Sequence, residues 1–377
     1  MAVQCSTTGR HLRHLLRRPR CICSSAISPR FLTTGAAADA HEAADQMLRT
    51  FEGKTATRRQ MIDGNQLQKL CITLGRKHLW PDLDVSTGTA PPRGTPLPPG
   101  YHLVYFTPSD LEGALGADGS DRTFNAPAPF TRRMWAGGRM RWFHEARLRV
   151  GEEVEERTKL VGATAKKSRD GSEMILVEVE KEFWGERGLS LVDQRSWIFR
   201  PEALPAAATT TRHDTRSNQP HAALTHGKSE VRDLRPQSTY SNAAAEGAFP
   251  ERHLSWSPVA LFRFSALTFN AHMIHYNESW TRSVEGHPNV VVHGPLNLIT
   301  MMDYWRDVHG EGGRLHAKQV AYRALSPIYA GESYKISSST SSDGGDGSSR
   351  NSEHPRHELL VKKGQTICMR GEILGHR

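Results

Sequence analysis

The feature that most constrains this fold is an internal duplication, because two halves of the chain repeat one pattern of elements. Residues 65–75 (NQLQKLCITLG) and 258–268 (PVALFRFSALT) both have the apolar pattern of a short helix that ends at a small or polar residue. Each is followed by a glycine turn and an apolar run, LVYF after Gly100 and NLITMM after Gly294. We expect each run to form a buried helix.

The segments after these glycines have the alternation of β-strands. A further glycine in each half, Gly151 or Gly331, ends one expected strand and precedes another. Residues 172–184 (SEMILVEVEKEFW) alternate apolar and polar side chains as a half-buried antiparallel strand does. Three more segments alternate in the same way: 157–165, 194–199 and 317–325. The sequence therefore predicts an α+β fold in which two antiparallel sheets each enclose one helix.

Two breaks in the pattern set the limits of the repeats. The polar run at about 206–237 has neither a helical nor a strand period, and we expect residues 203–248 to form a disordered linker. The segment 337–356, rich in Ser, Gly and Asp, has the composition of a surface loop between strands. The folded repeats are predicted at 44–202 and 249–377.

The basic charge of the chain is concentrated at its N-terminus. Residues 1–38 hold six arginines and no acid, so only +3 of the formal net charge of +9 belongs to the rest. The expected folded part has no basic stripe beside aromatic side chains, which argues against a nucleic-acid partner. The leader is rich in Arg, Ser and Thr, and its leucines alternate with arginines as on an amphipathic helix. This predicts a mitochondrial transit peptide at residues 1–40 and a location in the matrix, with a disordered arm as the alternative.

The remaining composition limits the class of protein further. Outside the leader the cysteines are Cys71 and Cys368, which do not form a disulfide framework of the kind found in small secreted domains. No stretch approaches the roughly 18 apolar residues of a membrane helix, so we expect no membrane span.

The strongest candidate for a functional site is 269–277 (FNAHMIHYN), with two histidines and two asparagines in nine positions. His272 and His275 could share one face of a helix, but zinc needs a third and a fourth ligand. The nearby candidates are two more histidines, His287 and His293, with no cysteine and no HExxH-type acid beside them. We therefore expect no metal and no cofactor at this site.

A catalytic role competes with a plain polar turn in which Asn270 only caps a helix. Gly294 is followed by Pro295, and proline at a first helical position favours a helix whose N–H groups can bind an anion. A histidine, an amide and such a donor are a usable set for proton abstraction beside a thioester carbonyl.

The stretches RFSALTFNAHMIHYN and EGHPNVVVHGPL resemble the MaoC-like hot-dog dehydratases, and most closely the type 2 hydroxyacyl-thioester dehydratases of fungal mitochondria. LPPGYHLVYF, LGADGSDRTFNAPAPFTRRMWAGG and LRVGEEV resemble the first repeat of that family. The resemblance implies a double hot-dog fold, with each curved sheet wrapped around one long helix. It also implies reversible dehydration of (R)-3-hydroxyacyl thioesters to trans-2-enoyl thioesters in mitochondrial fatty-acid synthesis, with the acyl group on acyl carrier protein or coenzyme A.

The resemblance also assigns roles, with one departure. The broad family has a D-x-N-P-x-H motif, and here Asn270 replaces its Asp and His272 replaces its Asn, so the acid of the dyad is absent. His275 is the expected general base, since a neutral imidazole with a pKa of about 6.5 suits proton abstraction near neutral pH. The N–H of Gly294 would hold the thioester oxygen, and Asn270 would orient the leaving hydroxyl. His272 would contact the substrate or support the loop.

The first half lacks an Asn and His pair after its first helix, where only His78 occurs, so we expect it to be catalytically silent and to shape an acyl tunnel. Arg132, Arg133 and Arg139 are candidates for phosphate contacts with phosphopantetheine or coenzyme A, with solvated surface as the alternative. Two other functions stay open: a coenzyme A thioester hydratase of short dicarboxylic acids (mesaconyl-type), and a non-catalytic acyl-thioester-binding protein. The sequence leaves open whether the chain forms a homodimer.

Overall fold

The computed structural model describes residues 39–202, 227–234, 249–340 and 354–376. The predicted transit peptide lies almost wholly outside the described residues, as do most of the predicted linker and the tip of the predicted Ser/Gly loop.

The first half begins with a helix and continues as a strand, a second helix and an antiparallel meander. Its elements are α1 (Ala40–Phe51), β1 (Thr55–Met61), α2 (Gly64–Thr73), the short β2 (His78–Trp80) and β3 (Leu83–Asp84), the 3-10 turns η1 (Tyr101–Val104) and η2 (Glu112–Ala114), β4 (Arg132–Trp142), η3 (His144–Ala146), β5 (Glu153–Lys167), β6 (Glu173–Gly185) and β7 (Gly188–Arg200).

The second half repeats the strand, the helix and the antiparallel meander, but it begins with an extra strand where the first half begins with the helix α1. Its elements are β8 (Glu230–Leu234), β9 (Glu251–Ser255), α3 (Pro258–Leu267), the 3-10 turn η4 (Met273–His275), α4 (Glu278–Ser283), α5 (Gly294–His309), the 3-10 turn η5 (Glu311–Gly313), β10 (His316–Ala324), β11 (Tyr334–Thr340), β12 (Arg356–Lys363) and β13 (Thr366–His376).

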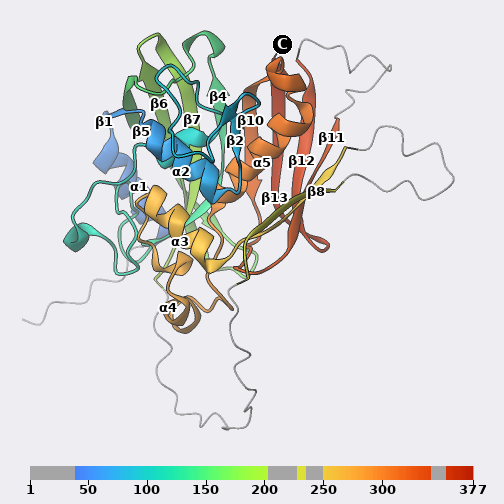
Figure 1. The fold of residues 1–377 in the computed structure, drawn as a ribbon. Helices are drawn as coiled ribbons and strands as arrows, with labels where there is room; N and C mark the ends of the chain where they lie inside the picture. The colour runs from blue at the N-terminus through green and yellow to red at the C-terminus, as the bar shows by residue number, and fades with distance from the viewer. Residues whose placement is uncertain (1–38, 203–226, 235–248, 341–353, 377) are drawn as a thin grey trace, which may run out of the picture. The chain divides into compact units, whose positions relative to one another are not determined.

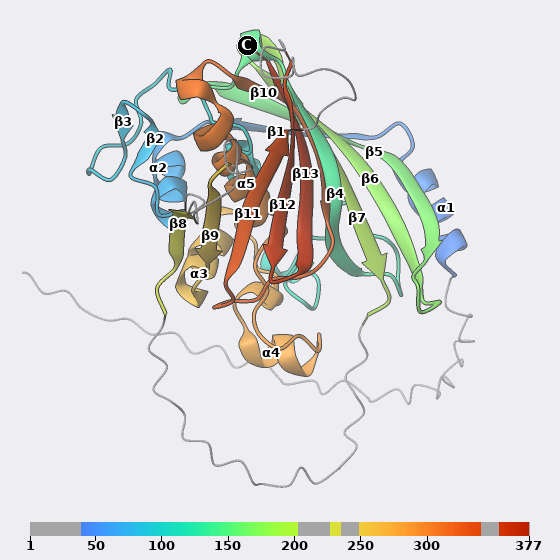
Figure 2. The ribbon, with the colours of Figure 1, turned by 90° about the vertical axis from the view of Figure 1, so that its right-hand side faces the viewer.

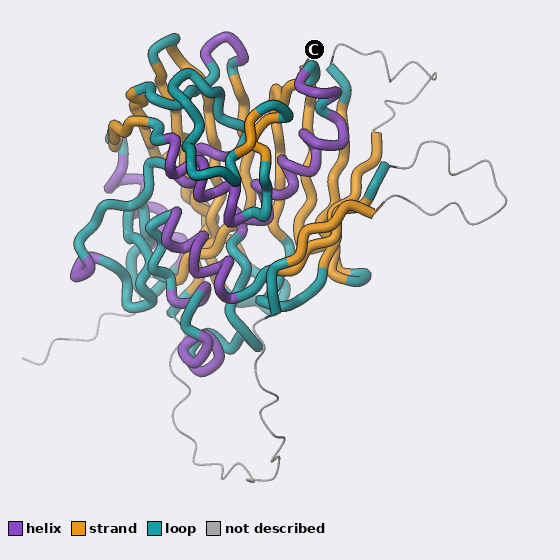
Figure 3. Tube along the Cα trace, viewed as in Figure 1, coloured by secondary structure: helices purple, strands orange, loops and turns teal. Residues whose placement is uncertain are grey.

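The duplication is visible in the strand order. The first half pairs in the order β1-β5-β6-β7-β4 and the second in the order β9-β11-β12-β13-β10, and both are antiparallel. Strands β4 and β10 pair antiparallel and join the two halves into one 11-stranded sheet. Helices α2, α3 and α5 lie on one face of it (Figures 1, 2 and 3). The predicted α+β double hot-dog fold is confirmed, with a continuous sheet instead of two separate ones.

The two halves differ in the helix that follows the repeated glycine. After Gly294 the chain forms the 16-residue α5, as predicted, but after Gly100 it forms only the four-residue η1, so the prediction of a long buried helix there is wrong. Phe106 adopts a left-handed φ of 53°, and its N–H donates to Oε1 of Gln60 at 2.7 Å while its carbonyl accepts from Arg58 at 3.2 Å. Side chains of β1 thus satisfy backbone groups that a longer helix would have bonded internally.

Strand β8 lies inside the segment that was predicted to be a disordered linker. Residues 230–234 pair antiparallel with β9, and Arg252 of β9 donates to both carboxylate oxygens of Asp233 at 2.7 and 2.9 Å. All five residues of β8 are exposed, so the strand carries no apolar alternation that a sequence pattern could reveal. Backbone pairing and a bidentate ion pair hold this edge strand in place.

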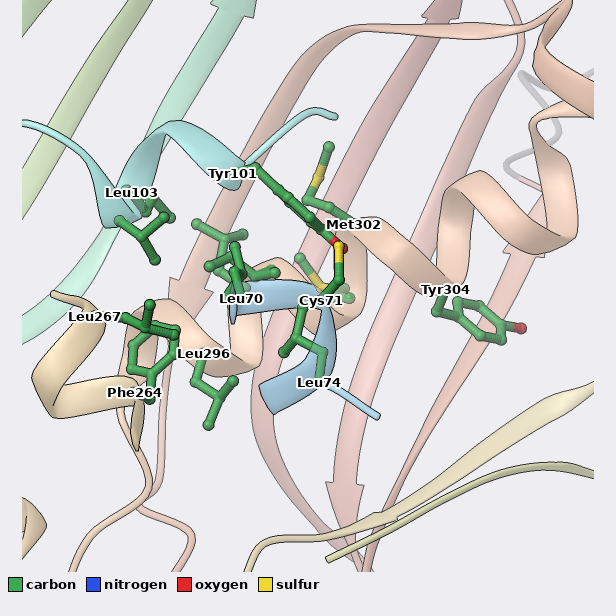
Figure 4. Packing of buried hydrophobic residues seen from close by; sticks show 14 of the residues in the cluster. Leu70, Cys71, Leu74, Tyr101, Leu103, Phe264, Leu267, Leu296, Met302 and Tyr304 are labelled. Atoms are coloured by element: carbon green, nitrogen blue, oxygen red, sulfur yellow. The ribbon is translucent and has the colours of Figure 1, made fainter. Parts of the chain in front are cut away.

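One hydrophobic core contains buried side chains from both halves of the chain. Apolar side chains of α2, η1, α3 and α5 meet there, among them Leu70, Cys71, Tyr101, Phe264 and Leu296 (Figure 4). Cys71 and Cys368 are both free and buried, as expected from the absence of a disulfide framework. Among the described residues no helix is long and apolar enough to cross a membrane.

Candidate active site

The candidate loop starts where α3 ends. The side chain of Ser257 caps the N-terminus of α3, and Pro258 begins it. After the last turn Phe269 adopts a left-handed φ of 47°, and the Asn270 N–H donates to the Ser265 carbonyl at 2.9 Å. This closing pattern reverses the chain and leads it into η4. The asparagine that caps a helix is Asn277, whose Oδ1 accepts from the Trp280 N–H of α4 at 3.0 Å, rather than Asn270.

His275 lies at the end of η4 and is only 8% exposed. Its Nδ1 is 2.7 Å from the carbonyl oxygen of Val291. A carbonyl can only accept, so Nδ1 must carry the hydrogen and Nε2 must carry the lone pair. The loop therefore presents His275 in the tautomer that a base needs.

His293 connects this imidazole to the start of α5. It is the N-cap residue of α5 and stacks on His275, with ring centroids 3.7 Å apart and an angle of 17° between the planes. Its Nε2 is 2.9 Å from the Ser265 hydroxyl, and its Nδ1 is buried without a hydrogen-bond partner among the described residues. Sequence reasoning weighed His293 only as a metal ligand and missed Ser265.

The start of α5 has the features expected of an anion site. The His293 side chain does not cap the helix, and proline occupies its first turn, so the backbone N–H of Gly294 is not claimed by a capping side chain. A Cβ at position 294 would lie 3.2 Å from Cγ of Trp135 on β4. Glycine is therefore the residue that lets α5 begin this close to the sheet.

The electrostatics of the loop keep the histidines neutral. The pKa of His275 is lowered to about 3, first by burial and then by the neighbouring His272, with the bond to Val291 opposing the shift. The pKa of His272 is lowered to about 4, again first by burial, while Asp118 opposes the change. Burial likewise lowers the pKa of His293 well below its ordinary value. At neutral pH the site thus holds three uncharged imidazoles.

His272 belongs to the site through contacts on both sides. Its backbone N–H donates to Oδ1 of Asn270 at 3.1 Å, and its ring lies 5.6 Å from that of His275. Its Nε2 is 3.4 Å from the Asp118 carboxylate, which comes from the loop before β4 in the first half. Nothing in the spacing of the sequence connects Asp118 to this loop, so sequence reasoning missed it.

The three candidate arginines do not form one cluster. Arg132 pairs with Glu285, and the Arg133 guanidinium donates to the Asp121 and Thr123 carbonyls at 2.8 and 3.2 Å. Arg139 is seven positions further along β4, roughly 20 Å away, and is exposed. Arg132 and Arg133 lie close enough to influence the pKa of His272, whereas Arg139 lies apart.

A cleft of about 620 Å³ opens beside Asn270. Its apolar lining includes Phe262, Phe269, Met273 and Leu115, and its polar lining includes three acids, Asp110, Glu112 and Asp121. The cleft is therefore built from the candidate loop, from α3 and from the first-half segment before β4. Among the described residues no group of three His, Cys, Asp or Glu side chains is placed to hold a metal ion.

Comparison with known sequences places the chain in a family. It matches the family "Hydroxyacyl-thioester dehydratase type 2" over residues 100–233 and 228–330. It is 32% identical to mesaconyl-C(4)-CoA hydratase of Chloroflexus aurantiacus over 219 residues, which is 58% of this chain and 67% of that protein. It is 27% identical to the mitochondrial hydroxyacyl-thioester dehydratase type 2 of Schizosaccharomyces pombe over 263 residues, which is 67% of this chain and 81% of that one.

Solved structures share the fold at low identity. A MaoC-like dehydratase superposes with a TM-score of 0.52 at 13% identity, covering 88% of this chain and 99% of the other. A MaoC-like dehydratase from Phytophthora capsici gives a TM-score of 0.51 at 14% identity, covering 85% of this chain and 94% of the other. These similarities support the arrangement of the two repeats.

Proposed function

This chain belongs to the hydroxyacyl-thioester dehydratase type 2 family, and we propose that it dehydrates (R)-3-hydroxyacyl thioesters to trans-2-enoyl thioesters. Its relatives place it among the dehydratases and hydratases of acyl thioesters. The reverse hydration uses the same groups. The observation that carries the proposal is the position of His275: its Nδ1 is bound to a backbone carbonyl, and its ring stacks on the residue that precedes Gly294.

The reaction follows from these positions. Nε2 of His275 takes the proton from C2 of the acyl group, and the electron pair moves toward the thioester carbonyl. The N–H of Gly294, at the start of α5, donates to the oxygen as it becomes enolate-like, a contribution of about 3 kcal/mol for one such donor. The electrons then return, the bond from C3 to oxygen breaks, and the hydroxyl leaves as water with the proton that His275 had taken. Asn270 orients the hydroxyl, because an amide can donate and accept hydrogen bonds but cannot transfer a proton at neutral pH.

The low pKa of His275 is compatible with this role. Burial disfavours the charged imidazolium form of His275. Negative charge that develops on the thioester oxygen beside Gly294 offsets that penalty, since opposite charges attract strongly in a buried site. The base thus becomes a better proton acceptor as the transition state forms.

A second substrate class is favoured by the 32% identity to mesaconyl-C(4)-CoA hydratase. A short dicarboxylic acyl group would bring a free carboxylate into the site. The cleft beside Asn270 offers Asp110, Glu112 and Asp121 instead of a free cation, and Arg133 is already bound to Asp121. Like charges repel, so this lining disfavours an acyl group that ends in a free carboxylate.

The proposed setting is fatty-acid synthesis in the mitochondrial matrix. It is supported by the basic leader, which has no acid over residues 1–38, and by the mitochondrial relative from S. pombe. A reporter fused to residues 1–40 should enter mitochondria, and a reporter that stays in the cytosol would contradict the transit peptide.

The activity is tested by adding the protein to trans-2-enoyl thioesters and following the absorbance of their conjugated double bond. Crotonyl and longer enoyl thioesters on coenzyme A and on acyl carrier protein should lose absorbance as water adds, and Asn270→Ala should be slower. Turnover of mesaconyl thioesters with no turnover of straight-chain substrates would establish the second substrate class instead.

A further inference from the structure

A loop of the first half reaches the candidate active site of the second half. The Met273 N–H, at the start of η4, donates to the backbone carbonyl of Asp118 at 2.8 Å. A Cβ at Gly119 would overlap the carbonyl oxygen of Ala271, so the two loops meet through a glycine. The first repeat, which we expect to be catalytically silent, therefore forms one wall of the site.

The carboxylate of Asp118 is held by its own turn and not by the site. Its Oδ1 accepts from the Ser120 N–H at 2.9 Å and from the Ser120 hydroxyl at 2.7 Å. The other oxygen, Oδ2, is 3.4 Å from Nε2 of His272. One oxygen thus anchors the side chain, and the second places negative charge against the imidazole.

This charge acts in a largely buried place. The side chains of Asp118 and His272 are 16% and 12% exposed. Charges at this depth are screened less by water than surface charges are. The groups that also face this histidine are His275, His287, Arg132 and Arg133. Each of the two arginines is paired with an acid of its own, Glu285 and Asp121.

His272 links the carboxylate to the base. Its ring stands nearly perpendicular to that of His275, at 82°, with centroids 5.6 Å apart. When His275 takes a proton, positive charge appears on a buried imidazole beside two neutral histidines, His272 and His293. A carboxylate oxygen 3.4 Å from the adjacent imidazole favours that positive charge through electrostatic attraction.

We propose that Asp118 of the first repeat supplies the carboxylate that position 270 lacks. Asp118 is a positioning residue: its Oδ2 lies 3.4 Å from Nε2 of His272, and its negative charge influences His275 through the His272 imidazole. The catalytic centre is then completed across the two repeats. This inference rests on the function proposed above and adds no step to the reaction, since Asp118 neither gains nor loses a proton.

The test is the pair Asp118→Asn and Asp170→Asn. Asp170-Gly171-Ser172 in the β5–β6 connection repeats the sequence Asp118-Gly119-Ser120, and Oδ1 of Asp170 accepts from the Ser172 N–H at 3.0 Å and from its hydroxyl at 2.7 Å. Asparagine keeps an Oδ1 acceptor in both turns and removes only the charge. Asp170→Asn thus measures the cost of losing an acid from this turn away from the site.

The readout is the separate effect on kcat and KM for an enoyl thioester. We expect Asp118→Asn to lower kcat about tenfold with KM nearly unchanged, because a neighbouring opposite charge changes the proton affinity of a histidine by about one pKa unit or more. Asp170→Asn should keep the wild-type kcat, and both variants should melt at similar temperatures.

His272→Gln provides a second route that does not depend on the Asp118 turn. If the charge acts through His272, the double variant with Asp118→Asn should be no slower than the slower single variant. Losses that multiply in the double variant, or an Asp118→Asn kcat equal to that of Asp170→Asn, would overturn the inference. Should Asp118→Asn fail to fold, a wild-type kcat in His272→Gln would overturn it as well. An inactive wild-type protein would instead refute the proposed function.

Discussion

The substitution Gly294→Ala tests the proposed oxyanion site, because it adds one methyl group whose contacts in the structure are known. In Gly294→Ala the new Cβ would lie 3.2 Å from Cγ and Cδ1 of Trp135, while ordinary carbon contacts are about 3.5–4.0 Å. The first turn of α5 or the indole must therefore move by a few tenths of an ångström. Misplacing a reacting group by about 1 Å costs about a hundredfold in rate, so this smaller shift should cost about tenfold, or about 1.4 kcal/mol.

The assay is kcat for enoyl-thioester hydration, measured together with the free energy of unfolding in urea. Gly294→Ala should lose rate while remaining folded, because overpacking at one site costs about 1–3 kcal/mol of stability. Gly88→Ala is the matched control, since a Cβ there would meet no atom within 4 Å. A folded Gly294→Ala protein with the kcat of the control would refute the assignment of this N–H as the oxygen's donor.

Two further predictions concern pH. Because the pKa of His275 is lowered to about 3, the base is neutral well below pH 6, and kcat/KM at pH 5.5 should be within about twofold of its value at pH 7. A histidine with the ordinary pKa of about 6.5 would instead lose about tenfold over that range. The free energy of unfolding should also fall as the pH drops below about 6.5, because His275 binds a proton in the unfolded chain but stays neutral in the folded chain. For one such histidine the loss is about 1.4 kcal/mol per pH unit. Urea denaturation between pH 7 and pH 5 measures this, and constant stability would contradict the buried neutral imidazole.

The duplication could be predicted because each half repeats local signals at matching places. Gly151 and Gly331 both adopt a positive φ, and their N–H groups donate to Ile62 and Trp256 after β1 and β9. The unequal helices after Gly100 and Gly294 could not be predicted, because the apolar run that suggested a helix is turned by contacts from β1. A local sequence pattern shows which secondary structure a segment favours, but tertiary contacts with distant residues determine where that element ends.

The candidate site divides in the same way. The stretch 269–277 is visible as a cluster of polar side chains, and the choice of His275 and Asn270 within it comes from the resemblance to the D-x-N-P-x-H motif. The contact of His272 with Asp118 joins the two halves of the chain. Asp118 lies in an Asp-Gly-Ser turn, and the same sequence with the same bond from the Ser N–H to the Asp Oδ1 occurs in the exposed β5–β6 hairpin. A turn motif of this kind predicts its own geometry but not what it faces.

The most direct test of the whole account is kcat/KM of His275→Ala with a trans-2-enoyl thioester, beside His253→Ala as a control on the partly exposed strand β9. General base catalysis contributes about a hundredfold to ten-thousandfold, so His275→Ala should lose at least about a hundredfold while the control keeps wild-type activity. A folded His275→Ala protein with full activity would contradict the central claim that this imidazole, fixed by Val291 beside the start of α5, takes the proton.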